Sequence, residues 1–153
     1  MDFITGYPPH FLGYLAKTKQ GCEYLNLRKE LVQLINVLIN PSSLEQSENV
    51  LIKFKAAIWA VAHIGSSNSG LQLLGRLYPK HDMIHIILEL SRKSDILSIR
   101  GQCMFSLCLF AQCSIGSDRL ESLDCSYTGG ICIPNTTAAY YDVRFYDIVT
   151  TCI

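Results

Sequence analysis

Three segments of the chain decide its fold, because they share one pattern: LAKTKQGCEYL (15–25), IGSSNSGLQLL (64–74) and FAQCSIGSDRL (110–120). In each, an apolar and a small residue precede four mostly polar residues, a glycine, three further residues and a leucine. The glycines are separated by 49 and 46 residues. Armadillo and HEAT repeats have periods of about 40–47 residues. The spacing therefore predicts an all-α, armadillo/HEAT-like helical-repeat solenoid segment with short insertions.

Helical signals flank these segments. A capping-box pattern, with Ser42 as N-cap and Glu45 three residues later, precedes apolar residues at helical spacing that end at Gly65. Further helices are expected at 27–39, about 69–77, from 83 onwards after Asp82 as N-cap, and about 96–112. The helix that starts at 83 is apolar on most faces, so we expect it to be sandwiched as the middle layer of the solenoid.

The repeat also predicts residues with structural roles. They are Gly21, Leu25, Trp59, Gly65, Gly70, Leu74, Arg100, Gly101, Gly116 and Leu120. Trp59 is expected in the core, as an anchor of the second unit's long helix, and Arg100 is expected to bond backbone carbonyls across the repeat. If Gly70 adopts a positive φ in its turn, a β-branched residue there would be strained.

The chain divides into a helical-repeat part and a different C-terminal part. Residues 1–123 are expected to hold units around 7–41, 42–94 and 95–123, and residues 124–153 a loop and tail. Residues 125–141 carry no charge and include two adjacent glycines, as in a loop. Residues 140–153 are aromatic and β-branched, which favours a strand. A poorly ordered tail, and sequence from a truncated reading frame, stay open as alternatives.

Composition excludes several classes of protein. The charged residues balance at 13 basic and 13 acidic, and a nucleic-acid binder normally has a clustered basic excess. The longest uncharged stretch, 56–75, is interrupted by polar residues, so no transmembrane segment is predicted. The first residues lack the pattern of a signal peptide. The seven cysteines are therefore expected to be reduced thiols in a cytoplasmic protein.

Two motifs resemble those of catalytic or ligand-binding sites, but structural roles explain them better. His81-Asp82-Met83-Ile84-His85 looks like a zinc-protease motif with Asp in place of Glu, which leaves a zinc hydrolase using His81 and His85 as a distant alternative. However, if Asp82 caps a helix, His81 lies outside it and the two rings do not share a face. Residues 65–70 have the glycine spacing of a phosphate-binding loop but lack the following lysine. We predict no catalytic residue, cofactor or metal.

Several stretches resemble the Rictor family, the rapamycin-insensitive companion of TOR. They are YPPH (7–10) with KQGCEYL (19–25), KAAIWAVAHIGSSNSGL (55–71), LSIRGQC (97–103) and GICIP (130–134). The resemblance implies a non-catalytic scaffold segment of TOR complex 2. Its implied partners are the TOR kinase and other subunits of the complex, and through them AGC-family kinases such as Akt. A cytoplasmic location is implied, with peripheral membrane association through the complex left open.

A generic armadillo-repeat adaptor, binding a peptide or a partner helix, is the alternative function. Such an adaptor needs a ladder of exposed Asn and Trp residues on successive long helices. Only Trp59 and Asn68 are candidates for that ladder in this sequence.

Overall fold

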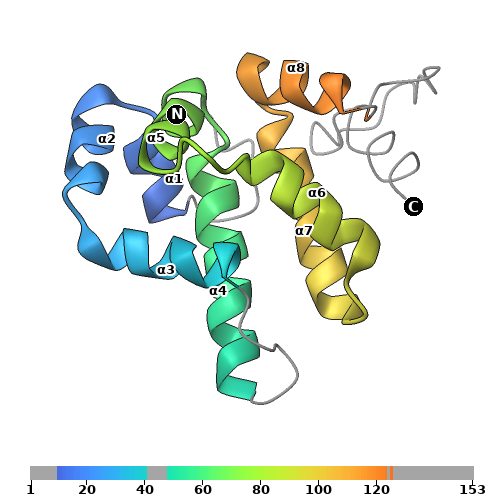
Figure 1. The fold of residues 1–153 in the computed structure, drawn as a ribbon. Coiled ribbons are helices and arrows are strands. Elements are labelled where there is room, and N and C mark those ends of the chain that lie inside the picture. The colour runs from blue at the N-terminus through green and yellow to red at the C-terminus, as the bar shows by residue number, and fades with distance from the viewer. Residues whose placement is uncertain (1–9, 41–47, 124, 126–153) are drawn as a thin grey trace, which may run out of the picture.

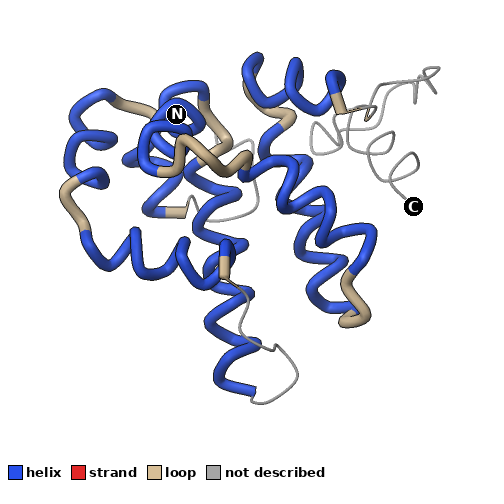
Figure 2. Tube along the Cα trace, in the orientation of Figure 1, coloured by secondary structure: helices blue, strands red, loops and turns tan. Residues whose placement is uncertain are grey.

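The computed structural model describes residues 10–40, 48–123 and 125, and every regular element within them is a helix (Figures 1 and 2). The helices are α1 (Phe11–Ala16), α2 (Lys19–Asn26), α3 (Lys29–Ile39), α4 (Glu48–Ile64), α5 (Asn68–Leu77), α6 (Met83–Lys93), α7 (Leu97–Phe110) and α8 (Ser114–Ser122). The predicted all-α, helical-repeat class is confirmed. The expected capping box at 42–45 and the expected strand at 140–153 lie outside the described residues.

The helices stack in two layers. In the first layer α4 packs between α1 and α7, and in the second α5 packs between α2 and α8. Helix α3 packs against α4, and α6 packs against α7. Figure 1 shows α4 running through the middle of the molecule, with α1, α2 and α3 on one side and α6 and α7 on the other. Helices α1, α4 and α7, and likewise α2, α5 and α8, thus contact their equivalents in the adjoining repeat, as in a solenoid.

The enclosed helix is α4, because small residues allow its neighbours to approach closely. Ala57 and Ala60 of α4 are buried, as are Cys103 and Ser106 of α7. The expectation that the helix starting at 83 is the sandwiched one is wrong. Helix α6 buries one face and leaves His85, Arg92 and Lys93 exposed on the other, so it is an amphipathic outer helix.

Several helix ends lie where the sequence predicts them. Helix α4 ends at Ile64, directly before Gly65, and α5 ends at Leu77, two residues before Pro79. The Asp82 carboxylate accepts backbone hydrogen bonds from Ile84 at 3.0 Å and from His85 at 3.2 Å, which confirms its role as N-cap of α6. The limits of the three repeat units stay a prediction.

Each repeated segment joins a helix of the first layer to one of the second. The segments run from the end of α1, α4 or α7 into α2, α5 or α8. Their closing leucines, Leu25, Leu74 and Leu120, are at most 2% exposed and belong to one core. The pattern is therefore a helix–turn–helix whose last residue packs inward.

The repeated glycines are required by a close approach of backbones. Gly21, Gly70 and Gly116 each lie in the first turn of the second helix. A Cβ atom there would meet the carbonyl oxygen that ends the preceding helix: Leu15 O at 1.9 Å, Ile64 O at 1.7 Å or Phe110 O at 2.0 Å. None of these glycines has a positive φ. The positive φ considered for Gly70 is thus wrong, and side-chain volume is the constraint.

We expect Gly70→Ala to destabilise the chain by more than about 2 kcal/mol, because its Cβ would overlap the Ile64 carbonyl and force α4 and α5 apart. Gly75→Ala in the same helix is the matched control, since a Cβ there meets nothing within 4 Å. This control should be neutral or stabilising by up to about 1 kcal/mol, from helix propensity. Urea denaturation of both variants measures the difference. Equal stability of the two variants would show that the contact is not required.

Candidate functional site

The N-cap residues of α5 and α8 also bond to the preceding repeat. Ser67 Oγ accepts a hydrogen bond from the Gly70 backbone at 3.2 Å and donates one to Ala16 O at 3.0 Å. At the equivalent position, Cys113 Sγ lies 3.7 Å from Gly65 O, a weak thiol hydrogen bond. Thr18 also caps its helix, but donates to Leu15 O within its own turn. At Ser67, capping and repeat stacking are therefore coupled through one atom.

Asn68 makes a second connection between neighbouring turns. Its Nδ2 donates to Ser114 Oγ at 2.9 Å, and its Oδ1 accepts from the Ile115 backbone at 3.0 Å. Both ends of the amide are thus used between α5 and α8. The side chain that an adaptor would offer to a peptide instead holds two repeats together.

Trp59 lies at the surface, and its expected place in the core is wrong. Its side chain is 38% exposed, and its ring stacks on Phe105 of α7 with centroids 5.2 Å apart and planes at 9°. The His63 ring meets it edge-on at 4.8 Å, and His10 meets it at 6.4 Å. Trp59 therefore joins α1, α4 and α7 through ring contacts on the outside of their layer.

The two histidines of this cluster favour the neutral state. Their rings stack 4.4 Å apart with planes at 10°. Burial, and to a lesser extent the neighbouring His10, lower the pKa of His63 to about 4. Burial also lowers the pKa of His10. His10 Nδ1 and His63 Nε2 are buried without a hydrogen-bond partner among the described residues, so a charged ring would be poorly solvated.

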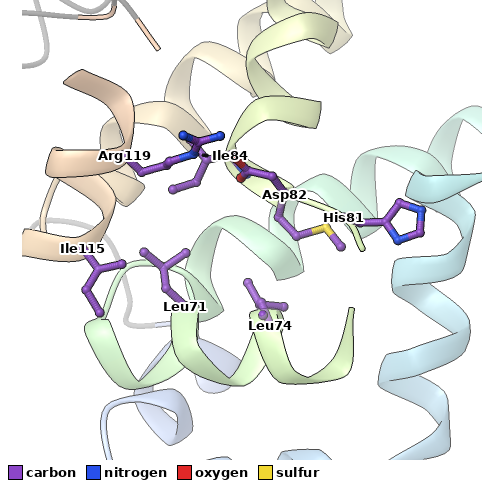
Figure 3. Close-up of a pocket in the computed structure, with 9 residues that line it drawn as sticks. Leu71, Leu74, His81, Asp82, Ile84, Ile115 and Arg119 are labelled. Carbon is purple, nitrogen blue, oxygen red and sulfur yellow. Dashed lines mark hydrogen bonds and ion pairs between the residues drawn. The ribbon is translucent and has the colours of Figure 1, made fainter. Parts of the chain in front are cut away.

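A groove of about 280 Å³ lies between α5, the start of α6 and α8 (Figure 3). Leu71, Leu74, Ile84 and Ile115 give it apolar walls. At its edge Arg119 Nε lies 2.6 Å from Asp82 Oδ2, while Asp82 Oδ1 caps α6. The carboxylate thus orders a helix start and ties it to α8.

The role of Asp82 as N-cap separates the two histidines of the possible zinc motif, His81 and His85. Figure 3 shows the His81 ring pointing away from the Asp82–Arg119 pair, and it lies edge-on to Tyr78 with centroids 6.5 Å apart. His81 precedes α6, whereas His85 lies within it. Among the residues that the structure describes, no three His, Cys, Asp or Glu side chains form a group that could hold a metal ion.

The remaining signature residues have different surroundings. Arg100 Nε donates to Ser91 O at 3.2 Å, so α7 bonds a backbone carbonyl of α6. A Cβ at Gly65 would lie 2.4 Å from the Phe110 ring, which makes glycine necessary where α4 ends. Gly101 is exposed, and nothing in the structure requires a glycine there. Cys103 is fully buried, and burial raises the pKa of its thiol to about 12.

The roles of the capping residues, of the His10–His63 pair and of Phe105 were not predicted from the sequence. The aligned segments do carry a signal for the caps, because Thr18, Ser67 and Cys113 share the fourth position. A signal for the rings appears when the alignment is extended backwards by five residues, which brings His10, Trp59 and Phe105 into register.

This arrangement defines a class of protein, a helical-repeat segment whose turns bond to one another. Residues 52–124 match the family described as "Rapamycin-insensitive companion of mTOR, domain 5". In the part of the chain that the structure describes, no helix is long and apolar enough to cross a membrane.

Individual proteins that are similar to this chain support the same family. The mouse and human proteins named "Rapamycin-insensitive companion of mTOR" are each 37% identical over 114 residues, which cover 74% of this chain and 6% of the relative. The fission yeast (Schizosaccharomyces pombe) protein "Target of rapamycin complex 2 subunit ste20" is 33% identical over 134 residues, 83% of this chain and 10% of the relative. The chain belongs to the Rictor family, and it spans a tenth or less of the length of these relatives.

We expect Ser67→Ala to cost about 2 kcal/mol of unfolding free energy, because it removes a helix cap and a bond to the preceding repeat. Thr18→Ala is the matched control, since Thr18 caps its helix without bonding another repeat. It should cost about 1 kcal/mol. Chemical denaturation compares the two variants. Equal losses would show that the bond to Ala16 adds no stability.

Acid should destabilise the chain through His63. Its pKa is about 4 when folded against 6.5 as the ordinary value, so between these pH values the unfolded chain binds more protons. The free energy of unfolding should therefore fall as pH is lowered from about 6.5 towards 4. His63→Phe keeps a ring beside His10 but cannot titrate, so its stability should fall less steeply. Parallel curves in urea denaturation across this pH range would contradict the prediction.

Proposed function

We propose that the chain is a non-catalytic scaffold segment of TOR complex 2. The observation that carries this proposal is its similarity to relatives that are named as subunits of that complex or as companions of mTOR. The geometry fits a scaffold, because the conspicuous polar side chains bond to neighbouring helices. Asp82, Arg119 and Asn68 all have such roles.

In this proposal the TOR kinase and other subunits of the complex are the partners. AGC-family kinases such as Akt are reached indirectly, as substrates of the assembled complex. The protein acts in the cytoplasm, and any membrane association comes through the complex. We also propose that the segment is organised as repeat units around 7–41, 42–94 and 95–123, so that each unit is supported by its neighbours.

The rival functions have less support. A zinc hydrolase would need the carboxylate of Asp82 as a base, but that carboxylate caps α6 and pairs with Arg119. An adaptor with an Asn and Trp ladder would need a free amide at Asn68, and that amide bonds to α8. Trp59 alone stays available at the surface.

We expect a tagged form of the protein, expressed in its longest reading frame, to enrich the TOR kinase and other complex 2 subunits from cell extract. Quantitative mass spectrometry of the co-purified proteins measures this. Gly70→Val should reduce the enrichment by about tenfold or more, because it disrupts the α4–α5 contact. Gly75→Ala, the control in the same helix, should retain it. A reproducible set of unrelated partners, without the kinase, would contradict the proposed function.

A further inference from the structure

The first layer of helices carries aromatic rings at equivalent positions. His10, Trp59 and Phe105 each precede a repeated segment by five residues, at or within α1, α4 and α7. Successive centroids are 6.4 Å and 5.2 Å apart, so the rings form a continuous row across the layer. We call these three residues the ring row.

Apolar surface continues from the ring row along α4. Ile52 lies two helical turns before Trp59 and is 58% exposed, so it shares the same face of α4. Exposed apolar side chains on the same face as a Trp ring are typical of an interaction site.

The charged residues of α4 after Glu48, and those of α7, are basic. Lys55 lies one turn before Trp59 and so shares its face of α4. Among the described residues the ion pairs are Lys93–Glu89 and Arg119–Asp82, and neither involves Lys55. The two neutral histidines add no competing charge.

We propose that the ring row is a docking surface for an extended, acidic peptide segment of a partner protein. In an extended chain, alternate side chains lie on one face about 6.6–6.8 Å apart. The centroid separations of 6.4 Å and 5.2 Å place successive rings within reach of such alternate side chains. Apolar side chains then pack on Trp59 and Phe105, and a carboxylate approaches Lys55. An amphipathic helix and a basic peptide are the outcomes that the test must separate.

This inference deepens the proposed scaffold function by naming the chemistry of one partner segment. It is tested on the purified chain with a synthetic probe. Association with TOR complex 2 can therefore stand if this surface binds nothing, and the surface can bind if that association fails.

Trp59 is the only tryptophan of the chain, so its fluorescence reports directly on the ring row. The probe is a synthetic peptide of alternating Leu and Glu residues, capped at both ends. We expect its addition to change Trp59 emission saturably. A peptide of alternating Leu and Lys residues, and a helix-forming peptide that places Leu on one face and Glu on the other, should bind at least about tenfold more weakly. Preference for either comparison peptide would overturn the proposal.

Single-residue variants test whether the peptide binds at the ring row. With a fluorescently labelled Leu/Glu peptide, anisotropy should show binding weakened about tenfold by Phe105→Ala and by Lys55→Glu. Lys80→Glu changes an exposed lysine outside α4 and α7, and should have little effect at moderate salt. Circular dichroism checks that each variant stays folded. Equal loss from Lys55→Glu and Lys80→Glu would show that the attraction is not local, and would also overturn the proposal.

Discussion

The contact on which the structure depends is the approach of one helix backbone to the end of the preceding helix. At Gly70 the distance from a Cβ position to the Ile64 carbonyl is 1.7 Å, which no side chain can occupy. The same contact recurs at Gly21 and Gly116. Since the glycine lies in the first turn of its helix, it fixes where the second-layer helix begins relative to the first. Because this contact occurs at three equivalent turns, the two layers of helices stack in register.

The hydrogen bonds between turns are a consequence of that register. Once the turns are stacked, the cap of one turn lies against a carbonyl of the turn before, as Ser67 lies against Ala16. The stabilisation per bond is modest, about 1 kcal/mol. In a solenoid each repeat contacts only its neighbours, so such bonds act at every interface and their effects accumulate along the stack.

The sequence predicted the fold class, the ends of α4 and α5 and the cap of α6, because these depend on local patterns. It was less reliable about burial. Trp59 was expected in the core because a large apolar ring usually packs there, but Phe54, Ala57, Ile58 and Val61 occupy the buried faces of α4. Trp59 instead shares the face of Ile52, which is 58% exposed. Which helix is enclosed depends on contacts between repeats, which a local pattern does not contain.

The same reasoning connects the glycines with the outer surface. His10, Trp59 and Phe105 form a row only because α1, α4 and α7 stack at equivalent heights, and the glycine joints set those heights. A substitution at Gly70 would shift α5 against α4, and through the bonds of Ser67 and Asn68 it would also disturb the neighbouring turns. An effect on the ring row would then reach the surface without any contact between the glycine and a partner. A loss of binding in a glycine variant is therefore evidence about register, whereas a loss in a Phe105 or Lys55 variant that keeps its fold is evidence about the surface itself.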